Sequence, residues 1–316
     1  MKVLLTGASS FSGMWFAREL ARAGHEVTAT FTRKRDQYSD ARAERVAIVL
    51  QNCKGVFGCA FGDDEFLRLA GSESWDALCH HGADVTNYRS PDFDVLAAVR
   101  GNTRNAAKVF RALGDASGGR ARVVATGSVF EHDEGAGSED LPAFSPYGIS
   151  KGFTYQVLRH EAARAGLTLG KFVIANPFGP YEEPRFTAYL VKTWFAGETA
   201  AVKTPEYVRD NIHVSLLARL YARFAEGVGT SLTPLRFGPM GYVESQGAFA
   251  TRFAAEMRPR LGLPCKLTLE RQTEFSEPRV RVNTSRVGAG GLGWNESVAW
   301  DEIAGYYKSR FAKVRP

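Results

Sequence analysis

The chain has 316 residues, 44% hydrophobic and 23% charged, which is typical of a folded globular protein and not of a disordered one. The net charge of +6 comes from Lys and Arg spread along the whole length, which argues against a nucleic-acid-binding face or tail. With no apolar run of about 18 residues and no C-x-x-C pair among the four cysteines, we expect no membrane span, metal site or disulfide framework.

Short apolar segments alternate with amphipathic ones through the first half of the chain. Strands are predicted at residues 2–6, 26–31, 55–61, 75–81, 122–126 and 168–175. Helices are predicted at residues 12–23, 39–51, 64–70, 93–113 and 146–165, with Ser39 or Asp40 as the cap of the second. Residues 1–5 are too short an apolar run for a signal peptide, so we expect a cytoplasmic protein that begins with a strand.

A glycine-rich turn, Thr6-Gly7-Ala8-Ser9-Ser10-Phe11-Ser12-Gly13, joins the first predicted strand to the first predicted helix. The N–H groups and the dipole of a helix N-terminus favour a bound anion such as pyrophosphate. Gly7 permits the tight turn and Gly13 lets helix and strand approach, whereas Ser10 replaces the usual middle glycine. The turn predicts a dinucleotide site formed by Gly7, Ser9, Ser10, Phe11, Ser12 and Gly13.

The end of the second predicted strand bears on the choice of dinucleotide. Sites for NAD usually have an acid here that binds the ribose hydroxyls, but no acid stands near Phe31. Arg33, Lys34 and Arg35 follow instead, a cluster suited to the extra phosphate of NADP. We predict that the cofactor is NADP, bound by Thr32, Arg33 and Arg35. The alternative is that the cofactor is NAD and that this basic loop is only solvated.

The alternation of strands and helices predicts an α/β fold, a Rossmann-type doubly wound parallel sheet with a smaller C-terminal α/β substrate lobe. After Asn176 the elements shorten, and Pro and Gly become frequent. We expect residues 1–175 to form the NAD(P)-binding domain and residues 176–316 to form mainly the substrate-binding lobe. Residues 205–226, including a helix at 214–226, are expected to return to the first domain.

Tyr147 and Lys151 stand one helical turn apart at the start of a predicted helix, after a strand that ends in Thr126. In this context the chain resembles the extended short-chain dehydrogenase/reductases, also called the NAD-dependent epimerase/dehydratase family. The turn at Thr6–Gly13 resembles T-G-x-x-G-F-x-G, and Thr126-Gly127-Ser128-Val129-Phe130 resembles S/T-x-x-V-Y. The resemblance implies that Tyr147 is the acid/base, that Lys151 favours its phenolate and holds the nicotinamide ribose, and that Thr126 orients the reacting oxygen.

Further motifs extend the resemblance over nearly the whole chain. Gly62-Asp63 resembles the adenine-contacting G-D, His80-His81-Gly82-Ala83 resembles H-L-A-A, and Gly293-Trp294 resembles the L-G-W signature. Asn102 matches the structural Asn of N-x-x-G-T, and residues 209–214 resemble R-D-F-I-H-V, whose Arg grips a sugar-nucleotide phosphate. The implied cofactor ligands beyond those named are Gly62, Asp63, His81, Gly82, Ala83, Asn102, Asn176 and Pro177. The implied substrate ligands are Thr126, Ser128, Asn176 and Arg209. Thr86, Asn87 and Tyr88 are expected either to line the sugar pocket or to pack within their loop, and Arg185 either to bind substrate or to pair with Glu183. A second phosphate ligand is expected in the C-terminal lobe, with Arg279 as a candidate beside Arg271 and Arg281.

The family implies a nucleotide-sugar substrate and a homodimer packed through the helices at 93–113 and 146–165. Dehydration is disfavoured, because Gly127 and Ser128 stand where the dehydratases of the family have carboxylates. Two reactions remain: epimerisation at a sugar carbon, with C4 the expected one, and NADPH-dependent reduction of a 4-keto-6-deoxysugar nucleotide. A redox sensor that binds NADP(H) without catalysis is a weaker alternative, since Tyr147, Lys151 and Thr126 are all present.

Overall fold

A computed structural model describes residues 1–138, 140–230, 233, 235–288 and 291–311. The chain forms two compact units that are interleaved in the sequence. The first unit comprises Met1–Glu134, Leu141–Ile174 and Ala218–Gly238, and the second comprises Gly135–Asp140, Ala175–Leu217 and the chain from Pro239 onward. Over the described residues, no helix is both long enough and apolar enough to cross a bilayer.

The first unit is built on a seven-stranded sheet with the order β11-β7-β5-β4-β1-β2-β3. Every pairing in it is parallel, which confirms the predicted doubly wound Rossmann-type fold. The strands are β1 (Lys2–Thr6), β2 (Glu26–Phe31), β3 (Lys54–Phe57), β4 (Ala77–His80), β5 (Arg122–Ser128), β7 (Thr168–Ile174) and β11 (Arg236–Phe237). The first two begin and end where the sequence predicts, whereas β3 stops four residues before the predicted end.

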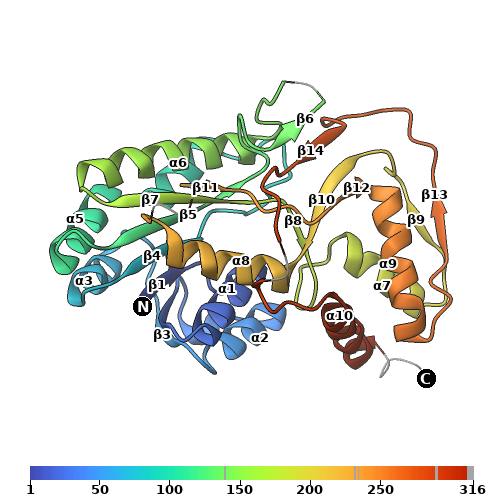
Figure 1. The fold of residues 1–316 in the computed structure, drawn as a ribbon, viewed down its shortest axis with the longest axis horizontal. Coiled ribbons are helices and arrows are strands. Elements are labelled where there is room, and N and C mark those ends of the chain that lie inside the picture. The colour runs from blue at the N-terminus through green and yellow to red at the C-terminus, as the bar shows by residue number, and fades with distance from the viewer. Residues whose placement is uncertain (139, 231–232, 234, 289–290, 312–316) are drawn as a thin grey trace. The chain divides into compact units, whose positions relative to one another are not determined.

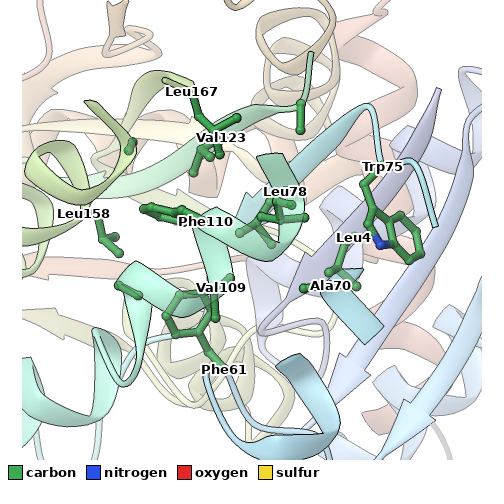
Figure 2. Packing of buried hydrophobic residues seen from close by; sticks show 14 of the residues in the cluster. Leu4, Phe61, Ala70, Trp75, Leu78, Val109, Phe110, Val123, Leu158 and Leu167 are labelled. Atoms are coloured by element: carbon green, nitrogen blue, oxygen red, sulfur yellow. The ribbon is translucent and has the colours of Figure 1, made fainter. Parts of the chain in front are cut away.

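Helices cover both faces of this sheet (Figure 1). They are α1 (Phe11–Arg22), α2 (Asp40–Val49), α3 (Asp64–Ser72), α4 (Val95–Asn102), α5 (Ala106–Ser117), α6 (Pro146–Arg164) and α8 (Val214–Gly227), with a short 3-10 turn at Arg35–Gln37. Figure 2 shows the core beneath α3, α5 and α6, where Phe110 and Leu158 pack with strand residues such as Leu78 and Val123. On the other face, the Phe16 ring of α1 stacks on the Tyr221 ring of α8 at 3.9 Å.

The single helix predicted at 93–113 is wrong, because the chain breaks between α4 and α5. Asn105 adopts a left-handed conformation (φ 51°), and its amide donates to the Gly62 carbonyl at 2.8 Å. The backbone packs so closely here that a Cβ on Gly62 would lie 1.7 Å from the Arg104 carbonyl oxygen. The apolar periodicity continues through the break, so the pattern alone gives no sign of it.

The second unit holds a mixed five-stranded sheet in the order β12-β10-β14-β6, with β8 paired to β10, and a two-stranded β13-β9 sheet. Its strands are β6 (Ala136–Gly137), β8 (Asn176–Phe178), β9 (Ala200–Val202), β10 (Val208–His213), β12 (Tyr242–Ser245), β13 (Leu267–Leu269) and β14 (Val280–Val282). Its helices are α7 (Phe186–Phe195), α9 (Gln246–Leu261) and α10 (Glu296–Phe311). Phe178, Trp194, Phe253 and Trp300 form the centre of its own hydrophobic core.

Candidate active site

The turn between β1 and α1 is closed by hydrogen bonds of Ser10. Ser10 is the N-cap of α1: its hydroxyl accepts from the Gly13 N–H at 3.1 Å and donates to the Gly7 carbonyl at 2.8 Å. A Cβ on Gly13 would lie 2.1 Å from the Gly7 oxygen, so only glycine fits there. The first turn of α1 has no acidic residue, which leaves the positive end of the helix dipole available to an anion. The substitution of the middle glycine by serine therefore supplies a cap that holds the turn.

Two consecutive histidines lie at the end of β4, His80 as its last residue and His81 directly after it, and both make hydrogen bonds. His80 lies 3.0 Å from the Thr6 hydroxyl through Nδ1 and 3.0 Å from the Asn102 carbonyl through Nε2. His81 joins the turn to β5: its Nε2 lies 3.1 Å from Ser10 Oγ and 3.0 Å from Ser12 Oγ, and its Nδ1 lies 3.2 Å from Thr126 Oγ1. Burial lowers the pKa of His80 to about 4 and that of His81 to about 3, so both rings are neutral at physiological pH.

The start of α6 places Tyr147 and Lys151. Ser145 caps the helix by accepting from the Gly148 N–H at 3.1 Å, and Pro146 occupies its first turn. The Lys151 ammonium is buried and donates to the Thr126 carbonyl at 2.6 Å. Burial lowers the pKa of Lys151 to about 8; the nearby Lys171 charge acts in the same direction, and Glu131 opposes it. The structure thus brings Lys151, Thr126 and His81 together at the end of β5.

Aromatic rings surround Tyr147, which is half-buried. The Tyr88 ring centroid lies 5.4 Å away, that of Phe93 6.1 Å and that of Phe130 6.4 Å, all in edge-on arrangements. These contacts fix the direction of the Tyr147 ring at the N-terminal turn of α6.

A buried ion network that the sequence analysis missed lies behind the end of β5. The Lys171 ammonium on β7 donates to Glu131 and to Glu134, each at 2.5 Å, and Arg236 donates to Glu134 at 2.9 Å. The Glu131 carboxylate also accepts from the Ser128 N–H at 2.7 Å. A lysine inside the apolar run of β7 is the one sequence signal that could have indicated this network, because a buried ammonium requires carboxylate partners.

The predicted cofactor ligands outside the turn differ in their surroundings. Thr32, Arg33 and Arg35 are exposed after β2, whose last residue Phe31 is buried. Asp63 caps α3, accepting from the Phe66 and Ala60 N–H groups at 2.8 Å each. The Asn102 side chain is buried, accepts from the Asp84 N–H at 2.8 Å and donates to Thr154 at 3.3 Å, so it joins the loop after β4 to α6.

The predicted substrate ligands of the first unit lie in the loop after β4 and at the end of β5. Thr86 and Asn87 are exposed and Tyr88 is half-buried, in a loop where the Thr86 N–H donates to Asp84 at 2.9 Å. The Ser128 hydroxyl accepts from the Phe130 N–H at 3.2 Å. Among the described residues, no three His, Cys, Asp or Glu side chains gather as metal ligands.

The second unit holds the remaining predicted ligands. Asn176 and Pro177 lie in β8 beside β10, and Arg185 lies 4.0 Å from Glu183 in a half-exposed ion pair. Arg209 is buried: it donates to the carbonyls of Val208, Pro278 and Arg279 and, at 2.9 Å, to Glu277. Arg279 is exposed, with its guanidinium over the Phe275 ring at 4.2 Å. Arg209 is thus held by its own unit, whereas Arg279, a candidate for the second phosphate ligand, is exposed.

Solved structures share the fold of this chain. A UDP-glucuronic acid 4-epimerase variant from Bacillus cereus, solved with UDP-4-deoxy-4-fluoro-glucuronic acid and NAD, matches with a TM-score of 0.71 and 14% identity over 98% of this chain and 100% of that one. A UDP-glucose 4-epimerase from Thermus thermophilus, solved with NAD, matches with a TM-score of 0.68 and 17% identity, over 98% of this chain and 99% of that one. DesIV, a dTDP-glucose 4,6-dehydratase from Streptomyces venezuelae, matches with a TM-score of 0.69 and 19% identity, over 99% of this chain and 98% of that one. These likenesses concern the fold.

Sequence comparison supplies the family. A search of curated protein sequences found no match. The model of the NAD dependent epimerase/dehydratase family matches residues 3–233, which include the glycine-rich turn, β5 and the start of α6. The chain therefore belongs to the NAD dependent epimerase/dehydratase family and is an enzyme of the extended short-chain dehydrogenase/reductase class, using a nicotinamide dinucleotide.

Proposed function

We propose that this protein is a nucleotide-sugar epimerase that transfers hydride at C4, with Tyr147 as the acid/base. The observation that carries the proposal is the arrangement at the end of β5: Tyr147 and Lys151 are one turn apart on α6, and the Lys151 ammonium lies 2.6 Å from the Thr126 carbonyl. The solved structures of similar fold include one 4-epimerase with a UDP-sugar analogue and NAD and another with NAD, which supports the same reaction class.

The residues of the turn and of β5 fit a dinucleotide. The tight packing of Gly13 on Gly7 and the acid-free first turn of α1 suit a pyrophosphate. When bound, the nicotinamide would accept hydride from the sugar carbon and return it. Lys151, charged below about pH 8, would hold the nicotinamide ribose and favour the phenolate of Tyr147 by its positive charge. Tyr147 would then take the proton of the sugar hydroxyl and return it to the keto oxygen.

The remaining parts of the proposal concern substrate and location. In this scheme the first unit binds the cofactor, while Asn176, Arg185, Arg209 and Arg279 of the second unit contribute to the nucleotide sugar site. Because Arg209 already donates to Glu277, a substrate phosphate would replace that carboxylate or share the guanidinium with it. All four cysteines are buried free thiols, which supports a cytoplasmic location.

The second candidate is an NADPH-dependent reductase of 4-keto-6-deoxysugar nucleotides. The exposed Arg33, Lys34 and Arg35 after β2 favour it, because net reduction commonly uses NADPH. A panel of 4-hydroxy and 4-keto nucleotide sugars, followed through the absorbance of the reduced nicotinamide and by product chromatography, separates the two. Interconversion of C4 epimers without net cofactor change supports the epimerase, and stoichiometric loss of NADPH supports the reductase. Binding of NADP(H) with no turnover of any sugar would instead favour the third alternative, a redox sensor without catalysis.

The basic cluster gives a prediction about the cofactor. Replacing Arg33 and Arg35 together by Ala is expected to weaken NADP binding by about ten- to a hundredfold, since each would remove a charge-assisted contact to the extra phosphate. NAD binding is expected to stay within about twofold, because NAD lacks that phosphate. Titration calorimetry with both dinucleotides measures the change, with exposed Lys108→Ala on α5 as the control. Equal weakening of NAD and NADP would contradict the NADP assignment.

An exposed apolar stripe supports a homodimer. Ile149, Phe153 and Val157 recur every fourth residue on α6 with 38%, 53% and 37% of their surface exposed, and Leu96 of α4 is 69% exposed. We propose that two copies pack through these helices, as the family resemblance implies. Phe153→Asp would place a charge in the interface and is expected to convert the dimer into a monomer in size-exclusion chromatography with light scattering. A monomeric wild-type protein, or a dimer unaffected by Phe153→Asp, would contradict this interface.

A further inference from the structure

His81 connects the dinucleotide turn with the hydroxyl group beside Lys151. Its two ring nitrogens face opposite ways: Nε2 toward Ser10 and Ser12, and Nδ1 toward Thr126 at 3.2 Å. The edge of the ring packs on Phe16 with the centroids 4.9 Å apart. The ring is therefore held between α1 and β5, and both nitrogens have partners on protein hydroxyl groups.

The hydrogen bonds of Ser10 determine which nitrogen of His81 has the proton. A serine hydroxyl has one proton, and that of Ser10 is donated to the Gly7 carbonyl at 2.8 Å. Toward the Gly13 N–H and toward His81, Ser10 Oγ can only accept. The contact of this oxygen with His81 Nε2 at 3.1 Å therefore has the ring nitrogen as donor. This nitrogen also lies 3.0 Å from Ser12 Oγ, and we infer that Nε2 has the proton.

The neutral state of the ring then fixes the direction of the Thr126 hydroxyl. Burial, together with the Lys151 charge, lowers the pKa of His81 to about 3, so the ring holds one proton and Nδ1 holds none. Thr126 Oγ1 must donate to Nδ1. Neighbouring His80 repeats this pattern, because its Nε2 donates to the Asn102 carbonyl and its Nδ1 accepts from Thr6, whose hydroxyl accepts in turn from the Gly82 N–H at 2.8 Å.

We propose that His81 is a positioning residue that takes up the proton of the Thr126 hydroxyl, so that Thr126 meets the substrate only as a hydrogen-bond acceptor. Under the proposed function, on which this inference rests, Thr126 accepts from the sugar hydroxyl but cannot donate to the keto oxygen. Tyr147 is then the side-chain donor to that oxygen. Because the sugar hydroxyl has one proton, it donates to Thr126 in the bound alcohol and turns to Tyr147 when the proton is transferred. The Ser10 and Ser12 hydroxyls hold His81 in the orientation that this requires.

Two amide variants separate the two ends of the ring. His81→Asn can place its carbonyl near the position of Nδ1 and keep an acceptor for Thr126, whereas His81→Gln can reach Ser10 and Ser12 but leaves Thr126 without one. We expect kcat of His81→Gln to be about tenfold lower than that of His81→Asn, the effect of about one hydrogen bond, with similar KM values in the two variants. In a Thr126→Val background the two variants should have equal kcat. Equal losses in both variants on the wild-type background, or the same difference in both backgrounds, would mean that His81 has only a structural role and would overturn the proposal.

A measurement without turnover distinguishes this proposal from the proposed function. In nitrogen NMR of the histidine-labelled protein, with the His81 signals assigned through His81→Asn, we expect one proton, on Nε2, between about pH 5 and 8. The Nδ1 signal should shift in Thr126→Val, because that variant removes the donor. A proton on Nδ1, or a charged ring in this range, would overturn the proposal even if the enzyme epimerises sugars. The expected tautomer in a protein that turns over no nucleotide sugar would instead reject the proposed function and keep the Thr126 hydrogen bond.

Discussion

Tyr147→Phe is expected to lower kcat by about a thousandfold while leaving cofactor binding within about twofold. The variant removes one oxygen atom and keeps the ring that packs against Tyr88, Phe93 and Phe130. The fold and the Lys151 contact to the Thr126 carbonyl should therefore persist. What is lost is the group that exchanges a proton with the sugar oxygen, and no other side chain of the proposed scheme takes its place. Steady-state kinetics with the best nucleotide sugar of the panel measures the effect.

Tyr155→Phe is the matched control, because it removes the same atom from a tyrosine two turns further along α6. The Tyr155 ring lies 4.1 Å from the Lys171 ammonium, a contact that phenylalanine retains. This control is expected to keep kcat within about threefold, since its hydroxyl has no part in the proton transfer. If Tyr147→Phe retained more than about a tenth of the activity, Tyr147 would not be the acid/base.

Lys171→Met is expected to lower the free energy of unfolding by about 3–5 kcal/mol, the largest stability effect that we predict. The substitution keeps the length of the side chain but leaves the buried Glu131 without its cation and Glu134 with Arg236 alone. Buried carboxylates that lose a cation are costly, because the protein interior solvates charge poorly. Urea unfolding followed by circular dichroism measures the change.

An exposed ion pair on α3 provides the control for the stability loss expected in Lys171→Met. Arg68 and Glu65 form an i,i+3 pair on α3 with side chains 73% and 40% exposed, so Arg68→Met is expected to change the stability by less than about 1 kcal/mol. Adding Glu131→Gln to Lys171→Met should restore part of the lost stability by removing the buried charge that Lys171 compensates in the wild-type protein. A loss in Lys171→Met no larger than that in Arg68→Met would show that the network at the end of β5 does not stabilise the fold.

Local patterns predicted the elements that local chemistry determines. The apolar runs of β1 and β2 end at turn residues, so their limits were predicted to the residue. The break between α4 and α5 was missed, because it depends on the close approach of Gly62 to Arg104, which the periodicity of the helix does not express. Of the two cap residues predicted for α2, Ser39 occupies the N-cap position, but its side chain makes no capping hydrogen bond.

In the candidate site, too, motifs predicted single residues but not the contacts between residues distant in sequence. Tyr147, Lys151 and Thr126 could be chosen from motifs, because their spacing and order along the chain resemble a family pattern. The link from Ser10 through His81 to Thr126 joins residues far apart in sequence, and so does the link from Lys171 to Glu131 and Glu134. Neither could be derived from spacing. Ser10, a departure from the motif in the sequence, is in the structure the cap of α1 and a partner of His81.

Hydride transfer at C4 is the central claim, and a nucleotide sugar with deuterium at C4 tests it most directly. After incubation with the protein and its dinucleotide, mass spectrometry and proton NMR would locate the label. We predict that the inverted epimer retains deuterium at C4, because the label leaves as hydride to the nicotinamide and returns to the same carbon. In a reductase run in reverse, the label would instead appear on the released reduced nicotinamide. Replacement of the deuterium by solvent hydrogen, which indicates proton abstraction at that carbon, would contradict the account.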